Sequence, residues 1–382
     1  MAAKKIVVAG HVCLDIIPQF LRAAPGLDEI IEPGKLVDIG PAVVSTGGAV
    51  ANTGLALHRL GLPVALMGKV GNDPFGRAIL DVFNNHDPAL TETMIIDPDV
   101  ASSYSVVINP PDIDRCFLHC PGANDTFSAA DIRPDSLAGA AIFHFGYPPL
   151  MRQMYARPGE LAQMLTTVRR AGLTTSLDMA LPDPASPAGR VDWAKLLAEA
   201  LPCVDLFVPS FEEIIYMLNP QRGLAVREAA AAGVPLGGLT SSDISALAGE
   251  LLAMGAAAVM IKLSKQGAVL HVTDNRERLQ ACGAAASALT TWRGAAIHAP
   301  CYEAQVAGTT GAGDCAVAGL LAALAKGCCA ATALRMAMAA GSASVERPDA
   351  TSGVPSWQAL EQRLAAGWGT ETVSTAGGWW QS

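Results

Sequence analysis

Short apolar runs alternate with amphipathic stretches along most of the chain, and this alternation predicts parallel strands covered by helices on both faces. The first run, residues 5–10, ends in Gly10 and predicts a buried strand. Residues 47–61 predict a helix, because apolar residues recur at helical spacing and Gly61 provides a stop. Further strands are predicted near 63–68, 141–145, 174–178, 205–208 and 257–263, and further helices near 159–170, 193–200, 242–254 and 330–344 and after residues 73, 210 and 311.

Two stretches interrupt the regular pattern. Residues 12–45 carry four prolines between short β-branched runs, which predicts edge strands and turns outside the main sheet. Residues 102–109 and 115–120 predict a hairpin, and we expect it to pair with the strands of the first stretch in a small separate sheet. The Gly/Thr/Ser-rich segment 367–382 predicts a loose tail whose tryptophans can dock elsewhere.

Composition narrows the class of protein. Of the 382 residues, 51% are apolar and 16% charged, so a large core is available and global disorder is excluded. The net charge of -9, without a block of lysines or arginines, argues against nucleic-acid binding. An odd number of scattered cysteines, nine in all, predicts reduced thiols. The short apolar run at the N-terminus and the absence of a membrane-spanning run predict a soluble cytoplasmic protein that does not enter the membrane.

The segment that follows residue 308 joins a glycine-rich turn to a predicted helix. Gly311, Ala312 and Gly313 let the backbone turn tightly and approach a ligand, and the apolar run after Asp314 predicts a buried helix. The start of such a helix presents free N–H groups and a partial positive charge, which favour a phosphate group. A carboxylate beside that phosphate is placed to take a proton from a hydroxyl group, so the segment predicts phosphoryl transfer to an alcohol. The local pattern fits equally an aspartate that only caps the helix.

Polar residues near two other predicted element ends are candidates for the substrate side. Asp15 follows the first strand, where a carboxylate can accept hydrogen bonds from a pair of sugar hydroxyl groups. For this residue taken alone, we favour a simple turn aspartate. Gly47 and Gly48 can bring backbone amides close to a polyol, and Asn52 offers a donor and an acceptor. Tight packing at a helix start is the alternative for these three residues.

Two further groups are candidates for the nucleotide side. Glu213, one turn into a predicted helix, can hold Mg²⁺ through water, and with Ser210 it also forms a capping-box pattern; the two roles are compatible. Lys262 and Lys265 precede Gly267 and are candidates for contacts with ATP phosphates. The alternative is a surface turn, and we favour that alternative for Lys265.

Taken together, these residues resemble the ribokinase-like (PfkB) carbohydrate kinase family from about residue 5 to residue 365. The early signature of that family, Gly-Gly-x-x-x-Asn, is present at 47–52 and is followed by the segment Lys-Val-Gly-Asn-Asp-Pro-Phe-Gly at 69–76. The late signature, Asp-Thr-x-Gly-Ala-Gly-Asp, corresponds to Gly308-Thr-Thr-Gly-Ala-Gly-Asp314. The resemblance implies a single doubly wound α/β domain over residues 1–382, with the small sheet as a lid over the sugar site.

The resemblance also implies an activity, the ATP-dependent phosphorylation of a hydroxyl group on a sugar or sugar-like molecule, with Mg²⁺ as cofactor. Asp314 is expected to be the general base, and the amides of Gly311, Ala312 and Gly313 are expected to form the anion hole. The other expected roles are substrate binding by Asp15, Gly47, Gly48 and Asn52, Mg²⁺ binding through water by Glu213, and nucleotide binding by Ser210, Glu213, Lys262, Ser264, Gly267, Thr309 and Thr310.

Several positions depart from the family pattern. Gly308 replaces an aspartate that in many members helps to bind an activating monovalent cation, so dependence on such a cation stays open. Ser210 replaces the usual Asn of Asn-x-x-Glu, and Ser264 replaces a usual Gly. Ala49 stands where ribokinases carry a lysine, which disfavours ribose as the substrate. A nucleoside kinase and a non-catalytic sugar or nucleotide sensor are the alternatives, and a homodimer through the lid strands is a further expectation.

Overall fold

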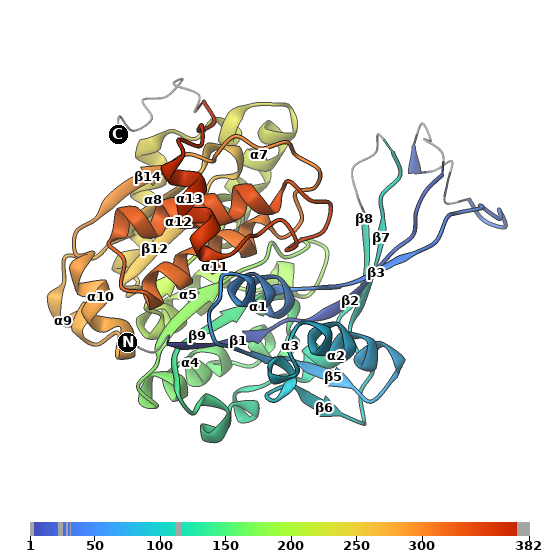
Figure 1. Cartoon of the computed structure of the whole chain (residues 1–382), viewed down its shortest axis with the longest axis horizontal. Helices are drawn as coiled ribbons and strands as arrows, with labels where there is room; N and C mark the ends of the chain where they lie inside the picture. The colour runs from blue at the N-terminus through green and yellow to red at the C-terminus, as the bar shows by residue number, and fades with distance from the viewer. Residues whose placement is uncertain (1–3, 22–25, 28–29, 31, 112–115, 373–382) are drawn as a thin grey trace.

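The computed structural model of the chain describes residues 4–21, 26–27, 30, 32–111 and 116–372. Its largest sheet has eight strands (Figure 1). Their spatial order is β14 (Ala296–Ala299), β13 (Ala268–Val272), β12 (Ala258–Lys262), β11 (Leu206–Phe207), β10 (Thr174–Asp178), β9 (Ala140–Gly146), β1 (Lys5–Gly10) and β4 (Val64–Met67). The strands from β12 to β4 are parallel, whereas β13 and β14 form an antiparallel edge. The predicted mostly parallel, doubly wound sheet is therefore confirmed.

Helices cover both faces of this sheet, as the alternating burial within β1 illustrates. Ile6 and Val8 pack into the core of one face, whereas Val7 and Ala9 pack into the core of the other. The first core receives residues from α1 (Ala49–Arg59), α2 (Pro74–His86), α9 (Arg276–Gln280), α10 (Ala286–Thr291), α11 (Ala312–Ala325), α12 (Ala330–Ser344) and α13 (Trp357–Ala365). The second receives residues from α3 (Arg152–Ala156), α4 (Glu160–Arg170), α5 (Trp193–Ala200), α6 (Phe211–Leu218), α7 (Pro220–Ala231) and α8 (Ser241–Ala253).

A separate four-stranded sheet projects from one side of this body (Figure 1). Its order is β3 (Val43–Gly47), β2 (Cys13–Ile17), β7 (Tyr104–Ile108) and β8 (Cys116–Cys120). The strands come from the two proline-broken stretches, and β7 pairs with β8 as the expected antiparallel hairpin. A parallel pair of three-residue strands, β5 (Lys69–Gly71) and β6 (Ile95–Asp97), was not expected, because runs this short carry no periodic signal.

The parallel strands end at a common edge, and the strand order reverses where β1 lies between β4 and β9. Ligands of open α/β sheets bind at such a switch point, beyond the carboxyl ends of the strands. Two glycines permit the close packing there. A Cβ atom on Gly10 would lie 2.3 Å from the carbonyl oxygen of Gly146. A Cβ atom on Gly146 would lie 2.1 Å from the Cβ atom of Ala49, at the start of α1.

The C-terminal stretch is docked as far as the structure describes it. The Trp368 ring stacks on Tyr302 with a centroid distance of 4.8 Å, and its indole N–H donates to the Glu303 carbonyl. The rest of the predicted loose tail, residues 373–382 with Trp379 and Trp380, lies outside the described residues. No helix in the described ranges is long and apolar enough to span a membrane.

A buried ion pair joins α9 to the centre of the sheet. The Arg278 guanidinium lies 2.8 Å from the carboxylate of Asp205, a side chain with no exposed surface, and also donates to the Val204 and Gly255 carbonyl oxygens. Removal of one partner from a buried pair leaves an uncompensated charge in the interior.

We therefore predict that Arg278→Met lowers the free energy of unfolding by about 3 kcal/mol, measured by urea denaturation. The matched control is Arg222→Met, because Arg222 forms an exposed pair with Asp243 and its loss costs no more than about 1 kcal/mol. Equal losses for the two variants would contradict the stabilising role assigned to the buried pair.

Candidate active site

Asp314 lies in the first turn of α11, directly after the glycine-rich turn. Gly311 takes the left-handed conformation (φ 74°), and a Cβ atom there would lie 2.6 Å from that of Ala350, so glycine is required. From Cys315 to Leu324 every residue of α11 is buried, so the helix is fixed in the core and holds its first turn in place. Asp314 itself is 3% exposed.

The carboxylate of Asp314 accepts hydrogen bonds from two distant segments. The Asn52 amide on α1 donates to Oδ2 at 2.9 Å, and the Tyr147 hydroxyl, just after β9, donates to both oxygens at 2.8 Å. Burial raises the pKa of Asp314, while the nearby Lys262 ammonium and these two donors oppose the rise. The side chain therefore interacts across the site, and its role goes beyond that of a helix cap.

A second buried carboxylate lies beside the first. Asp178 ends β10 and binds the Lys262 ammonium at 2.7 and 2.8 Å. Burial raises the pKa of Asp178, while the attraction of the Lys262 ammonium opposes the rise. The ammonium also lies 3.6 Å from the position of a Cβ atom on Gly313, so its positive charge is next to the start of α11.

Glu213 completes this charged group. Ser210 and Glu213 form a full capping box on α6: the glutamate carboxylate accepts from the Ser210 N–H at 2.7 Å, and the serine hydroxyl accepts from the Glu213 N–H at 3.3 Å. Burial is the main cause of the raised pKa values of Asp178 and Asp314, and the Glu213 charge adds to both. The capping role is confirmed, and the side chain is close enough to act on the site electrostatically.

The predicted substrate side lies at the base of the four-stranded sheet. Asp15 is on β2, opposite Ser45 of β3, and a Cβ atom on Gly47 would lie 2.3 Å from its carboxylate. Burial raises the pKa of Asp15. Gly48 has a positive φ of 87° and is the N-cap residue of α1, which carries Asn52 one turn later. Of the four predicted substrate residues, Asn52 is the one with a direct hydrogen bond to Asp314 in the described contacts.

A histidine pair joins this small sheet to the main body. The Nε2 atoms of His11, after β1, and His119, on β8, lie 3.4 Å apart, and His119 Nδ1 is 3.0 Å from the Ser105 hydroxyl. Burial, with a smaller contribution from His119, lowers the pKa of His11 to about 3, so its ring is neutral at physiological pH. The His11 ring lies 6.1 Å from that of Tyr147, between centroids.

The predicted nucleotide turn follows β12. The Leu263 N–H donates to the Gly267 carbonyl. Position 267 requires glycine, because its φ is positive, 91°, and because a Cβ atom would lie 2.0 Å from the Ala299 carbonyl oxygen. Ser264 also has a positive φ, 54°, at the position where the resemblance implies a glycine. Thr309 and Thr310 lead into the Gly311 turn, whereas Lys265 is exposed.

Gly308 stands where the resemblance implies a carboxylate for a monovalent-cation site, and the backbone packs closely around it. Position 308 supplies no carboxylate, and a Cβ atom there would lie 2.9 Å from the Pro348 carbonyl oxygen. The carbonyl of Val345 already accepts from the N–H groups of Ala307 and Gly308. The residues of the α11 turn fit a nucleotide phosphate with Mg²⁺, because backbone N–H groups and the Lys262 ammonium lie at one helix start, and the Glu213 carboxylate acts electrostatically on Asp314 in the same turn.

Tyr147 and Asp178 were missed in the sequence. Both stand at the carboxyl ends of strands predicted near 141–145 and 174–178, and the rule that ligands bind beyond those ends was a signal for them. This rule alone does not identify the site residues, because every parallel strand of the sheet has residues at its carboxyl end. Their contacts with Asp314 and Lys262 depend on the order of the strands, which the sequence pattern does not provide.

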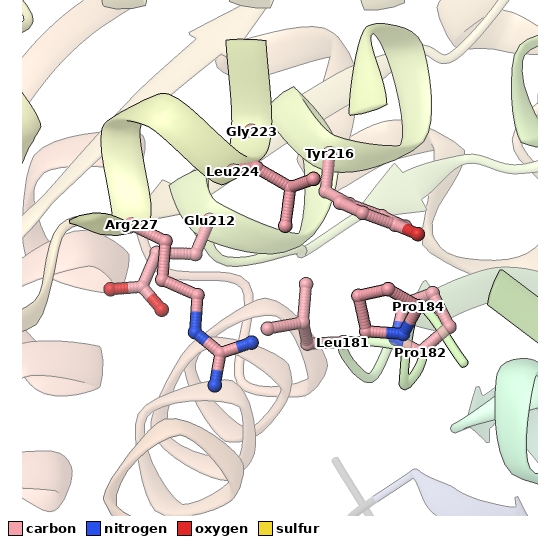
Figure 2. A pocket seen from close by; sticks show the side chains of 8 residues that line it. All are labelled: Leu181, Pro182, Pro184, Glu212, Tyr216, Gly223, Leu224 and Arg227. Atoms are coloured by element: carbon pink, nitrogen blue, oxygen red, sulfur yellow. The ribbon is translucent and has the colours of Figure 1, made fainter. Parts of the chain in front are cut away.

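A hollow outside this site lies between the segment after β10 and helices α6 and α7 (Figure 2). Leu181 and Leu224 point toward each other within it, and Glu212 and Arg227 lie together at one end (Figure 2). It is lined by Leu181, Pro182, Pro184, Glu212, Tyr216, Gly223, Leu224 and Arg227. No predicted site residue belongs to this lining, so the hollow is separate from the Asp314 group.

Comparisons with known proteins identify the family and the fold of the chain. The sequence model described as pfkB family carbohydrate kinase matches residues 3–357. Solved structures with the same fold include an Arabidopsis thaliana ribokinase with ribose and ATP (21% identity, 95% of this chain and 99% of that chain, TM-score 0.70). Another is a putative ribokinase II from E. coli with ATP and Mg²⁺ (20% identity, 95% of this chain and 99% of that chain, TM-score 0.66). A third is a Methanocaldococcus jannaschii nucleoside kinase (19% identity, 96% of this chain and 100% of that chain, TM-score 0.65). A comparison with curated protein sequences gives no match.

The raised pKa of Asp314 leads to a prediction about stability. The folded state binds the Asp314 proton more tightly than the unfolded state, so this group favours folding at low pH, and that contribution is lost as the pH rises from about 3.8 through the raised value. The neutral variant Asp314→Asn should therefore melt at least about 2 °C above the wild type at pH 7.5, and the difference should shrink toward pH 4.

The control for this measurement is Asp243→Asn. The hydrogen bond from Thr240 lowers the pKa of Asp243, so the ionised carboxylate of Asp243 stabilises the folded state at neutral pH, whereas that of Asp314 destabilises it. This variant should melt below the wild type at pH 7.5. A lower melting temperature for Asp314→Asn at that pH would show that Asp314 is not strained by its burial.

Proposed function

Since the chain belongs to the pfkB family of carbohydrate kinases, we propose that it transfers the γ-phosphoryl group of ATP to a hydroxyl group of a sugar or a related polyol. The observation that carries the proposal is the buried Asp314 carboxylate at the start of α11, with the Lys262 ammonium beside the neighbouring Gly313. Phosphoryl transfer requires an oriented nucleophile and a positive environment for the transferred group, and this one helix start offers both.

In this mechanism Asp314 accepts the proton of the acceptor hydroxyl while the oxygen attacks the γ-phosphorus and ADP leaves. The backbone N–H groups of Gly311, Ala312 and Gly313, with Lys262, balance the charge on the phosphoryl oxygens. Mg²⁺, when bound, neutralises further charge on the nucleotide phosphates, and Glu213 would hold it through water. The raised pKa of Asp314 suits a general base that must accept a proton near neutral pH.

The remaining site residues divide between the two substrates. We assign the acceptor to the side of β2, β3 and α1, where the four-stranded sheet would act as a lid, and the nucleotide to the turns after β12 and before α11. The acceptor residues are Asp15, Gly47, Gly48 and Asn52, and the nucleotide residues are Ser210, Ser264, Gly267, Thr309 and Thr310.

The same sheet supports the proposal of a homodimer. Val43 and Val44 on β3 and Phe117 and Leu118 on β8 are each more than half exposed, although their side chains are apolar. Both strands are also edges of the sheet, which can pair with another strand. A second copy of the chain that covered these residues would remove the apolar surface from water.

The assignment of Asp314 as the base predicts how the enzyme responds when its carboxylate is replaced by an amide. Asp314→Asn should reduce the turnover number by at least about a thousandfold, because the amide cannot accept the hydroxyl proton, while the affinity for ATP stays within about threefold. The measurement is ADP release with Mg-ATP across a panel of sugars, polyols and nucleosides, combined with calorimetric titration of ATP.

Asp243→Asn, on the surface helix α8, is the control and should retain full turnover. Near-normal turnover of Asp314→Asn would rule out Asp314 as the base. Product from nucleosides alone would favour the nucleoside kinase alternative. Tight binding of an acceptor without ADP release from any member of the panel would favour the sensor.

The Lys262 ammonium has a predicted role of its own. The double variant Lys262→Met/Asp178→Asn removes both charges of the buried pair, so neither charge is left without its partner. Turnover should still fall by about a hundredfold, because the positive charge beside Gly313 is lost. Lys265→Met, in the exposed turn, is the control, and equal turnover in the double variant and the control would contradict the role of Lys262.

A further inference from the structure

Tyr147 has an unusual backbone conformation at the carboxyl end of β9. Its φ of 68° and ψ of 44° lie in the left-handed region, which is uncommon for residues other than glycine, asparagine and aspartate. The conformation is held from both sides: the Tyr147 N–H donates to the Asp178 carbonyl at 3.3 Å, and the Tyr147 carbonyl accepts from the Leu150 N–H at 2.9 Å. Strained residues of this kind gather at functional sites, and here the strained residue supplies a side chain to Asp314.

The position of the Tyr147 hydroxyl is the second observation. Its oxygen lies 2.8 Å from both carboxylate oxygens of Asp314. A general base must be about 2.6–3.2 Å from the hydroxyl group that it deprotonates. The phenol oxygen therefore occupies a place from which an acceptor alcohol, or a water molecule, would lose its proton to Asp314. Burial, together with the Asp314 charge, raises the pKa of Tyr147, so the phenol stays protonated and acts as a donor.

We infer that Tyr147 occupies the acceptor position next to the base until an alcohol displaces its hydroxyl group, and that it thereby selects an alcohol over water. The inference deepens the proposed function and rests on it. Hydrolysis of ATP would be the competing reaction: the oxygen of water bonds to the γ-phosphorus, the bond to the bridging oxygen breaks, ADP leaves and Asp314 takes the proton. The Tyr147 hydroxyl excludes the water molecule that this reaction needs.

The remaining contacts of Asp314 make the inference testable. In a Tyr147→Phe variant the ring stays, and an oxygen-sized space opens beside two carboxylate oxygens, which are suitable partners for a water molecule. Asn52 still donates to Oδ2 at 2.9 Å, so the carboxylate keeps its orientation. The variant should therefore retain a working base and gain a water molecule beside it.

The experiment measures ADP release by the full-length protein with Mg-ATP and no acceptor, while intact-protein mass spectrometry confirms that the protein itself takes up no phosphate. Tyr147→Phe should hydrolyse ATP about tenfold faster than the wild type. The double variant Tyr147→Phe/Asp314→Asn should fall back to the rate of Asp314→Asn. Tyr155→Phe is the matched control, because its ring packs near Trp193, away from Asp314, and it should match the wild type.

A measurement without nucleotide checks the contact itself. Thermal unfolding of the two single variants and the double variant should show that their effects are not additive, as expected for residues in direct contact. If Tyr147→Phe does not fold, Tyr147→Asn takes its place, because asparagine tolerates the left-handed conformation.

The outcomes separate the inference from the kinase assignment. If the wild type phosphorylates an acceptor and Tyr147→Phe hydrolyses ATP within twofold of the wild type, the role of Tyr147 is overturned and the assignment stands. If Tyr147→Phe gains hydrolysis through Asp314 while the wild type phosphorylates no acceptor, the role of Tyr147 is supported and the proposed function is contradicted.

Discussion

A carboxylate that is buried at a helix start has to be supplied with hydrogen-bond donors, and the rest of this site depends on how Asp314 obtains them. Its donors are Asn52 and, at the longer distance of 3.5 Å, Thr53, both from the first helix of the chain, and Tyr147 from the end of β9. The small residues Gly10, Gly146 and Ala49 allow these segments to pack closely at the switch point of the sheet. Helix α11, buried along its length, fixes the carboxylate itself. The geometry around one side chain is thus a product of the whole fold.

The charges of the site follow a similar logic. The Asp178, Glu213 and Asp314 carboxylates act on the Lys262 ammonium, and against the effect of burial their charges raise its pKa. Burial raises the pKa of both aspartates, which means that ionisation of the free site is costly. In the proposed reaction the Glu213 carboxylate would hold Mg²⁺ through water, and the metal would supply positive charge to this group of carboxylates.

The sequence predicted much of this arrangement, and the physical reasons for its failures are specific. The spacing of apolar residues predicted the strands and helices of the α/β sheet, and the glycine-rich motif predicted the turn before α11. Both features are set by residues close together in the sequence. The pairing of Ser210 with Glu213 was foreseen for the same reason. Tyr147 and Asp178 were missed, because their roles arise from contacts with residues 167 and 84 positions away. The left-handed backbone of Tyr147 depends in part on its hydrogen bond to the Asp178 carbonyl, a tertiary contact that the local sequence does not indicate.

The most direct test of the central claim is a crystal structure of the protein with a non-hydrolysable ATP analogue, Mg²⁺ and an acceptor identified from the substrate panel. We expect the acceptor hydroxyl to lie within hydrogen-bond distance of the Asp314 carboxylate, where it replaces the Tyr147 hydroxyl. We also expect the terminal phosphate to lie against the Gly311–Gly313 amides and Lys262. An acceptor bound elsewhere, for example in the hollow between Leu181 and Leu224, or a terminal phosphate remote from α11, would contradict the claim.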